Sequence, residues 1–199
     1  MRIISGIYKS RRFDVPKNFK ARPTTDFAKE NIFNVSGNLI DLEDAVALDL
    51  FSGTGSIAFE LVSRGCKEVV CVEKDPAHYA FIKKVKAELA AENLITIKTD
   101  VFKYIKSARQ TFDFIFADPP YSLPTLSKIP EMIFSHHLLK PEGVFIMEHP
   151  REQDFSRLPY FTQRRVYGAV NFSIFVFSSR VTIQTTLQSP DCSNPPKDY

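Results

Sequence analysis

The chain has 199 residues, 44% of them hydrophobic, which is enough for one packed α/β domain with a small appendage. No apolar run approaches the ~20 residues that cross a bilayer, and the first residues lack the apolar stretch of a signal peptide, so we expect a cytoplasmic protein. The cysteines Cys66, Cys71 and Cys192 lack the spacing of metal ligands; we expect reduced thiols and no bound metal.

Positive charge is concentrated in the first 29 residues. This segment holds eight Lys and Arg against two Asp, a net charge of +6, so the rest of the chain carries −3 of the total +3. A basic segment on a slightly acidic body is typical of a protein that binds a polyanion. The candidate contacts are Arg11, Arg12, Lys20 and Arg22, and a solvated surface hairpin is an equally open explanation.

The N-terminal residues predict a small β-hairpin. Residues 2–8 and 12–15 are partly β-prone, with a turn at 9–11, and residues 16–23 form a loop. We therefore assign residues 1–24 to a basic hairpin and loop, the candidate docking segment for a polyanion.

A helix is expected next. It begins near Thr25 or Asp26, because either side chain can accept a hydrogen bond from a first-turn N–H, and it ends at Gly37. We expect it to bury three aromatic or aliphatic side chains, namely Phe27, Ile32 and Phe33.

From residue 45 onward, strands and helices alternate. The predicted strands are 46–51, 68–73, 94–99, 112–118 and 143–148, and the predicted helices are 55–64, 76–92, 101–108 and 125–137. Apolar strands between amphipathic helices predict a Rossmann-like, mostly parallel sheet covered on both faces. Two further strands, 162–167 and 170–178, form an antiparallel hairpin that brings the sheet to seven strands. The main domain thus spans 25–180, and the polar tail 181–199 is predicted to be disordered.

A turn with two glycines follows the first buried strand, within residues 49–55. Gly53 and Gly55 let a ligand approach the backbone closely. The pattern G-x-G-x-x-A, with Glu73 placed 20 residues after Gly53, also fits a dinucleotide site, so an NAD-dependent enzyme has to be considered. Asp49 argues against it, because a carboxylate repels a pyrophosphate, whereas it suits the ammonium of S-adenosylmethionine.

Acidic residues also end the next two predicted strands. Glu73 is placed to accept from both ribose hydroxyls, and Asp100 to accept from the adenine amino group, with the Val101 backbone nearby. Either residue alone is equally well explained as a helix N-cap or a solvated strand end, but the ordered set favours a cofactor site at the carboxyl ends of the strands. The predicted cofactor-binding residues are Asp49, Phe51, Gly53, Gly55, Glu73, Asp100 and Val101.

A second motif, at residues 118–121, follows the apolar strand 112–117. The Asp118 carboxylate and the Pro119 carbonyl are two acceptors on a backbone fixed by two prolines, and Tyr121 can stack on a base. Together they suit an exocyclic amine, whose lone pair is aimed at a methyl group when both N–H bonds are held. The motif therefore predicts methyl transfer to a nucleobase nitrogen, with Asp118, Pro119 and Tyr121 as catalytic residues. Glu148 and His149 end the fifth strand nearby, where contact with substrate and a structural role are both open.

Four segments resemble the bacterial 16S ribosomal RNA guanine-N2 methyltransferases of the small subunit. They are Arg2–Gly6, Arg22–Asp26, Asp49–Gly55 and Asp118–Tyr121, in the same order and at similar spacings. The last two are shared by many amino-methyltransferases, and the first two narrow the choice. The resemblance, over roughly residues 1–180, implies a class I S-adenosylmethionine-dependent methyltransferase fold, an RNA-binding N-terminal hairpin and a guanine presented by the assembling small subunit.

The sequence thus predicts a monomeric enzyme that uses S-adenosylmethionine to methylate guanine N2 in 16S RNA. One rival is a DNA adenine-N6 methyltransferase, which is disfavoured because 199 residues leave no obvious target-recognition domain. Another is a ribosome-assembly factor that binds RNA without turnover, which the intact Asp118 motif disfavours.

Overall fold

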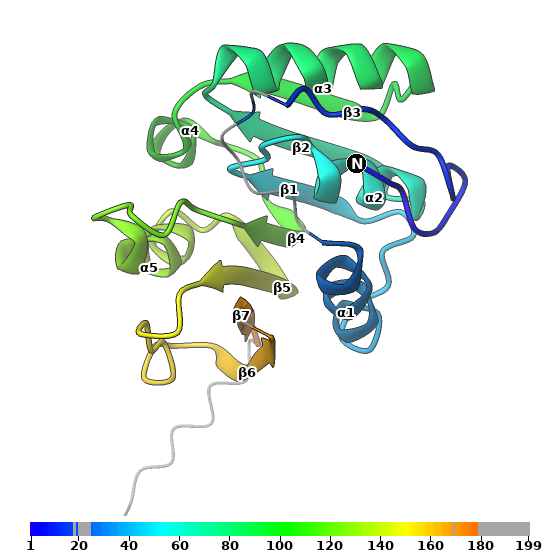
Figure 1. Cartoon of the computed structure of the whole chain (residues 1–199). Coiled ribbons are helices and arrows are strands. Elements are labelled where there is room, and N and C mark those ends of the chain that lie inside the picture. Colours follow the sequence, from blue (N-terminus) through cyan, green and yellow to red (C-terminus); the bar gives the residue numbers. More distant parts are fainter. Residues whose placement is uncertain (18, 20–24, 169, 179–199) are drawn as a thin grey trace, which may run out of the picture.

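Seven strands form one sheet in the order β3-β2-β1-β4-β5-β7-β6 (Figure 1). In this computed structural model, which describes residues 1–17, 19, 25–168 and 170–178, β1 to β5 are parallel, and β7 and β6 are antiparallel to their neighbours. The strands are β1 (Val46–Leu50), β2 (Glu68–Glu73), β3 (Leu94–Lys98), β4 (Phe112–Ala117), β5 (Leu139–His149), β6 (Phe161–Tyr167) and β7 (Val170–Val176). The predicted sheet, parallel with an antiparallel C-terminal pair, is confirmed.

Helices cover both faces of the sheet (Figure 1). They are α1 (Asp26–Ser36), α2 (Ser56–Ser63), α3 (Pro76–Leu89), α4 (Val101–Ser107) and α5 (Ile129–Ser135), with a short 3-10 helix η1 (Leu126–Lys128). Strand β4 shows how the layers form: Phe114 and Phe116 pack on the side of α1, α2 and α3, while Ile115 and Ala117 pack on the side of α4 and α5. The apolar run 114–117 is therefore buried on both faces. Within the described part of the chain, no helix is long and apolar enough to cross a membrane.

Some element bounds differ from the predicted ones. Strand β5 begins at Leu139, not at residue 143, because Leu139 pairs with Phe112 across a register shift. Helix α3 ends at Leu89, because Ala90 adopts a left-handed backbone with φ of 50°. The single helix predicted over 125–137 is divided into η1 and α5. Cys66 and Cys71 are free, buried thiols, while Cys192 and the tail 181–199 lie outside the described residues.

Helix α1 has the predicted ends but not the predicted buried face. Thr25 caps it, since its Oγ1 accepts from the Ala28 N–H at 3.2 Å, and Gly37 ends it. The prediction that Phe27 is buried was wrong: its side chain is 63% exposed. The buried stripe follows the helical repeat through Ala28, Lys29, Ile32, Phe33 and Ser36. Phe27 lies off this stripe, and its ring meets the Tyr167 ring edge-on at 6.2 Å.

The N-terminal segment, residues 1–13, folds back on itself without forming regular strands. Its one bridge joins Arg2 and Arg12, and the Phe13 N–H donates to the Met1 carbonyl at 2.9 Å. The predicted hairpin is therefore reduced to a short paired loop. The reason lies in α2, where the buried Glu60 carboxylate accepts the N–H groups of residues 4 and 5 at 2.8 and 2.9 Å. These two N–H groups therefore donate to one side chain and not to the carbonyls of a neighbouring strand.

Candidate functional site

Carboxylates line the edge of the sheet where the parallel strands end. In sheet order they are Asp100 after β3, Glu73 on β2, Asp49 on β1, Asp118 after β4 and Glu148 on β5. The parallel register places them together, because Leu50 lies opposite Ala117, and Ala117 lies opposite Met147. This edge is where ligands bind in open α/β sheets.

The glycine turn, residues 51–55, joins β1 to α2 through left-handed backbone. Phe51, Gly53 and Gly55 have φ of 59°, 53° and 74°. For Phe51 this conformation costs of order 1 kcal/mol or more and is typical of functional sites. At Gly55 a Cβ atom would also lie 2.9 Å from the Phe59 ring, so only glycine fits. The turn is fixed by the Gly53 N–H, which donates to Glu73 Oε2 at 2.7 Å.

Asp49 lies beneath this turn and is only 2% exposed. Its Oδ2 accepts from the Ala58 N–H, at the start of α2, at 3.2 Å. Burial raises the pKa of Asp49 to about 7, hydrogen bonds from Ser52 and Ala58 offset part of this rise, and the charge on Glu73 adds to it. A buried carboxylate of this kind is stabilised by a cation brought close to it.

Asp100 has the N-cap role that the sequence left open, whereas Glu73 is buried, caps no helix and holds the backbone around the glycine turn. Glu73, 7% exposed, accepts from Gly53 and also from the Asp75 N–H at 2.7 Å. Asp100 caps α4 by accepting from the N–H groups of Phe102 and residue 103, at 2.9 and 3.3 Å. A carboxylate offers about four acceptor positions, so these bonds are compatible with a ligand hydroxyl or amino group. The proposed ribose and adenine contacts stay predictions.

Phe51 and Val101 are placed beside these carboxylates. The Phe51 ring meets the Phe102 ring at 6.3 Å in an edge-on arrangement, and the Val101 side chain is 3% exposed. Both side chains belong to the apolar layer on the α4 and α5 side of the sheet.

The amine site (Asp118, Pro119 and Tyr121) begins directly after β4. The Asp118 N–H donates to the Leu50 carbonyl at 3.4 Å, so the carboxylate is held beside the end of β1. Burial raises the pKa of Asp118 well above its ordinary value, and the negative charges of Glu148 and Asp49 raise it further. The Tyr121 ring is 47% exposed, as a stacking surface requires.

Glu148 and His149, which the sequence left open, have different roles. Tyr121 donates its hydroxyl to Glu148 Oε1 at 2.9 Å, which brings Glu148 into the amine site. The His149 ring is fully buried, with Nδ1 2.9 Å from the Pro150 carbonyl and Nε2 2.9 Å from the Ser173 hydroxyl. Burial lowers the pKa of His149, as expected for a neutral structural imidazole. Glu148 could have been found from its position on the strand next to Asp118, which requires the sheet order.

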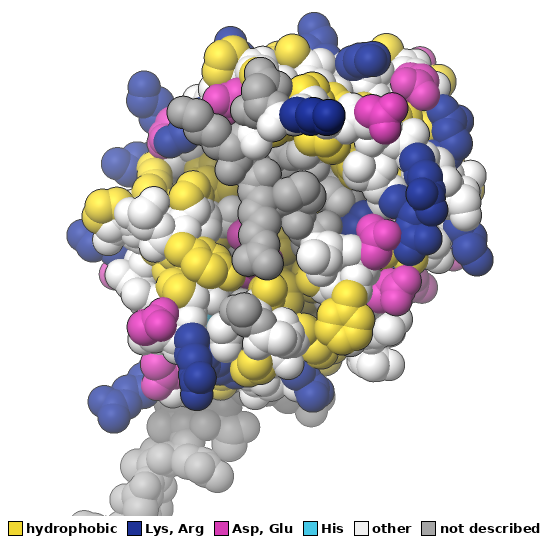
Figure 2. All heavy atoms as spheres, viewed as in Figure 1, with side chains coloured by type: hydrophobic (Ala, Val, Ile, Leu, Met, Phe, Trp, Pro, Cys, Tyr) yellow, Lys and Arg dark blue, Asp and Glu magenta, His cyan; other side chains and the backbone are white. Residues whose placement is uncertain are grey.

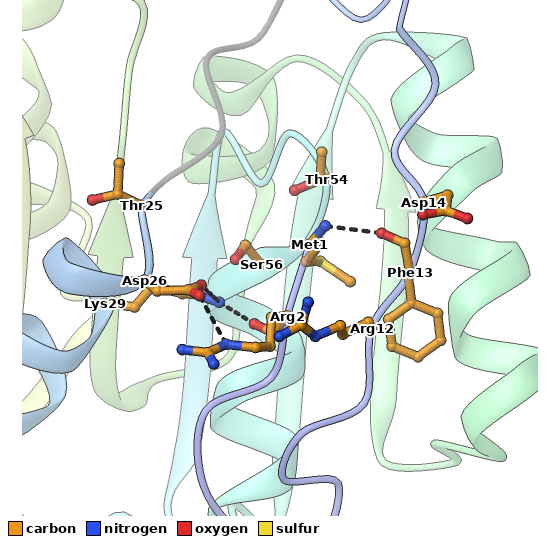
Figure 3. A pocket seen from close by; sticks show the side chains of 10 residues that line it. All are labelled: Met1, Arg2, Arg12, Phe13, Asp14, Thr25, Asp26, Lys29, Thr54 and Ser56. Atoms are coloured by element: carbon orange, nitrogen blue, oxygen red, sulfur yellow. Dashed lines mark hydrogen bonds and ion pairs between the residues drawn. The ribbon is translucent and has the colours of Figure 1, made fainter.

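Arg11 and Arg12, two of the predicted polyanion contacts, have different surroundings. Arg11 forms an ion pair with Glu88 of α3 at 3.2 Å. Arg12 lines a cleft of about 600 Å³ that also contains Thr54 and Ser56 (Figure 3). Lys and Arg side chains are frequent on the side of the molecule where this segment and α3 run, with acidic side chains among them (Figures 1 and 2). The other two predicted contacts, Lys20 and Arg22, lie outside the described residues.

The chain matches a known protein family along most of its length. The model of the family described as conserved hypothetical protein 95 matches residues 1–176. The putative rRNA methyltransferase YlbH of Bacillus subtilis is 32% identical over 185 residues, covering 88% of this chain and 98% of that protein. The ribosomal RNA small subunit methyltransferase D of Buchnera aphidicola subsp. Baizongia pistaciae is 30% identical over 148 residues, covering 74% of this chain and 75% of that protein.

Solved structures share the fold. A putative methyltransferase, yhhF from Escherichia coli, has a TM-score of 0.79 at 25% identity and covers 89% of this chain and 98% of that one. An RNA methyltransferase from Salinibacter ruber, solved with S-adenosyl-L-homocysteine, has a TM-score of 0.63 at 17% identity, over 80% of this chain and 96% of that one. The fold is that of Rossmann-like S-adenosylmethionine-dependent methyltransferases. The chain therefore belongs to the conserved hypothetical protein 95 family, the family of ribosomal RNA small subunit methyltransferase D.

Proposed function

We propose that this protein transfers the methyl group of S-adenosylmethionine to the N2 amine of a guanine in 16S ribosomal RNA. The observation that carries the proposal is the position of the amine site directly beside the glycine turn. The Asp118 N–H donates to the carbonyl of Leu50, the last residue of β1 before the glycine turn. The two proposed amine acceptors therefore lie at the same edge of the sheet as the turn that is proposed to hold the cofactor. Two bound reactants would be held next to each other there, which supports in-line transfer.

The residues present fit S-adenosylmethionine better than a dinucleotide. Asp49 is a buried carboxylate with a raised pKa, which favours a ligand ammonium and disfavours a pyrophosphate. The positive φ angles of Gly53 and Gly55 keep this turn open to close approach. In this proposal Asp49, the turn and Phe51 hold the methionine part, Glu73 accepts from the ribose, and Asp100 and Val101 hold the adenine.

The chemistry asked of the protein is positioning more than proton transfer. When bound, S-adenosylmethionine supplies a methyl group on a cationic sulfur. Asp118 and the Pro119 carbonyl accept the two N–H bonds of the amine, which frees its lone pair from the ring and aims it at the methyl carbon. Tyr121 stacks on the flipped base, an interaction worth about 1–3 kcal/mol. The amine loses a proton readily once alkylated, so Asp118 needs only modest basicity.

The choice of 16S RNA rests on the family. Relatives are named ribosomal RNA small subunit methyltransferase D or putative rRNA methyltransferase. The basic N-terminal segment beside the cleft supports an RNA substrate, because each phosphate that it neutralises adds a salt-dependent gain in affinity. In this proposal the protein acts as a cytoplasmic monomer on the assembling small subunit.

The test is a methylation assay with labelled S-adenosylmethionine and three substrates: small subunits, naked 16S RNA and DNA. The modified nucleoside is then identified after digestion. We expect label in N2-methylguanosine from 16S RNA, and labelling about 10²–10³-fold slower with Asp118→Ala protein, which controls for a contaminating enzyme. Label in N6-methyladenine of DNA would support the rival methyltransferase, and no label in any substrate would support a non-catalytic assembly factor.

A further inference from the structure

We infer that Glu148 recognises the target base by accepting the N1–H of the guanine whose N2 amine is held by Asp118 and the Pro119 carbonyl. This assignment rests on the proposed function, because it requires a guanine in the amine site. It makes Glu148 a specificity-determining residue, placed at the base atom where guanine and adenine differ most.

The first support is the position of Glu148 on the neighbouring strand. Strands β4 and β5 are parallel, with Ala117 opposite Met147, so Asp118 and Glu148 occupy the next matching positions. Side chains at matching positions of parallel strands lie on the same face of the sheet. Glu148 is half-buried, as a residue that contacts a bound ligand should be. Its charge contributes, after burial, to the raised pKa of Asp118, which agrees with two carboxylates in one site.

The second support is the hydrogen bond from Tyr121. Its hydroxyl donates to Glu148 Oε1 at 2.9 Å, which links the carboxylate to the ring proposed to stack on the base. A base stacked on the ring would have its plane set by it, and the hydrogen bond keeps the carboxylate at the edge of the same ring. One carboxylate can accept from both a tyrosine hydroxyl and a base N–H, because it has about four acceptor positions.

The third support is the chemistry of the base edge. The Watson–Crick edge of guanine carries two neighbouring donor groups, N1–H and the N2 amine. When both carboxylates are ionised, they and the carbonyl offer acceptors only, so they match this edge. Adenine has an unprotonated N1 next to its amine, and its lone pair would face the charge on Glu148. The pair Asp118 and Glu148 therefore favours guanine and opposes adenine at the same site.

A simpler role for Glu148 would be to hold the Tyr121 ring in place. Glu148→Gln separates the two roles, because the amide oxygen can still accept from the Tyr121 hydroxyl. The amide also has an NH2 group, which can donate to an unprotonated N1. A purely structural Glu148 would thus lower the rate on every base alike, whereas an N1-reading Glu148 would change the preference between bases.

The probe is 2-aminopurine, which has the same 2-amino group as guanine but an unprotonated N1. Once the target nucleotide has been mapped, 16S RNA is assembled by ligation with either guanosine or 2-aminopurine riboside at that position. Single-turnover rates on both RNAs are measured for the wild type, Glu148→Gln and Tyr121→Phe. Comparing ratios between proteins cancels the intrinsic difference in reactivity between the two amines.

We expect the wild type to prefer guanine, and Glu148→Gln to shrink this preference by about 10- to 100-fold, the range for a hydrogen bond to a charged group. Tyr121→Phe, which keeps the carboxylate, should retain most of the preference. Equal losses on both RNAs in Glu148→Gln, or a wild type without preference, would overturn the inference. Absence of N2-methylguanosine in the wild-type reaction would instead overturn the proposed function. If Glu148→Gln does not fold, Glu148→Asp, which keeps an ionised acceptor, must retain the preference at a lower rate.

Discussion

Asp118 is the side chain on which turnover depends most directly, since it is one of two acceptors proposed for the amine. Asp118→Ala removes this acceptor and leaves the Pro119 carbonyl in place. We expect single-turnover methylation to fall by about 10²–10³-fold, the loss typical of removing one preorganised hydrogen-bond partner. The measurement is a rapid-quench assay at saturating cofactor.

Cofactor affinity is the control for Asp118→Ala. Asp118 lies after β4, outside the set of residues proposed to bind the cofactor, so calorimetry should give nearly the same dissociation constant as for the wild type. A near-normal rate of single-turnover methylation would show that the amine is held by other groups.

The proposed pairing of Asp49 with the ammonium of S-adenosylmethionine makes cofactor binding depend on pH. Its pKa of about 7 means that the carboxyl is mostly protonated below pH 7 and must lose this proton to pair with an ammonium. Affinity for S-adenosylmethionine should therefore weaken, by up to about tenfold per pH unit, as the pH falls from about 7 to about 5.5. Calorimetry at a series of pH values measures this directly.

Asp49→Asn is the matched control, because it keeps the shape and removes the titration. Its cofactor affinity should be weak and nearly constant over the same pH range. The stability of the wild type relative to Asp49→Asn should also depend on pH, but it should fall as the pH rises. Folding raises the pKa of Asp49 above its ordinary value of 3.8 to about 7, so the wild type loses stability relative to the variant as the pH rises between these two values. A Tm difference that does not grow over this range would contradict the raised pKa.

At the scale of elements, Glu60 joins the N-terminal segment to α2. It is fully buried and accepts from two backbone N–H groups and, at 3.0 Å, from Arg64. Glu60→Gln replaces one acceptor oxygen by a donor that faces another donor. We expect a loss of about 3 kcal/mol in the free energy of unfolding, as when a buried ion pair is broken. The segment should also become accessible to trypsin at Arg11 and Arg12.

Glu88→Gln provides the comparison for this experiment. Glu88 pairs with Arg11 at 3.2 Å, but both side chains are about half exposed, so the loss should stay below about 1 kcal/mol. Urea unfolding of both variants gives the two free energies. Equal losses in the free energy of unfolding would mean that the burial of the Glu60 carboxylate adds nothing to its stabilising effect.

The same interaction explains which parts of the fold the sequence could predict. Strands such as β2 were located to the residue, because an apolar run bounded by turns is a local property. The N-terminal pairing was not, because its backbone donors bind Glu60, 56 residues away from Ile4 along the chain. Phe27 was misplaced for a similar reason: which side of α1 is buried depends on where the helix lies against the sheet, not on composition.

Within the site, the positions of the acidic residues could be predicted from the sequence, but their hydrogen-bond partners could not. The sequence placed Glu73, Asp100 and Asp118 at strand ends, where the structure has them. That Glu73 holds the Gly53 N–H, or that Glu148 accepts from Tyr121, depends on which strands are neighbours. Sheet order is a property of the whole fold, so it could not be predicted from local patterns in a single sequence.

At the scale of the whole molecule, RNA docking and cofactor binding should be separable. The basic segment precedes the proposed cofactor-binding residues; Arg11 pairs with Glu88 of α3, and Arg12 lines the cleft without being one of those residues. Neutralising Arg11, Arg12 and Lys20 should weaken RNA binding. It should also reduce the slope of log affinity against log salt by about 0.9 for each duplex phosphate that is no longer neutralised. Affinity for S-adenosylmethionine should stay nearly constant.

A second triple variant controls for net charge. Lys103, Lys106 and Arg109 are exposed on and after α4, which covers the opposite face of the sheet from α1, α2 and α3. Neutralising them removes the same charge and should leave the salt slope almost unchanged. Equal slopes in the two variants would mean that RNA docks elsewhere and that the N-terminal segment is a solvated hairpin.

The bond between Glu60 and the backbone of Ile4 also has a consequence for the order of synthesis. Residues 1–13 leave the ribosome before α2, and Glu60 is made 56 residues after Ile4. At about 5–20 residues per second, the segment spends roughly 3–10 s as a hydrated, positively charged chain close to ribosomal RNA. The nascent segment would thus be free to bind ribosomal RNA, the kind of polyanion that the protein is proposed to modify. It would remain so until α2 folds and Glu60 accepts its backbone N–H groups.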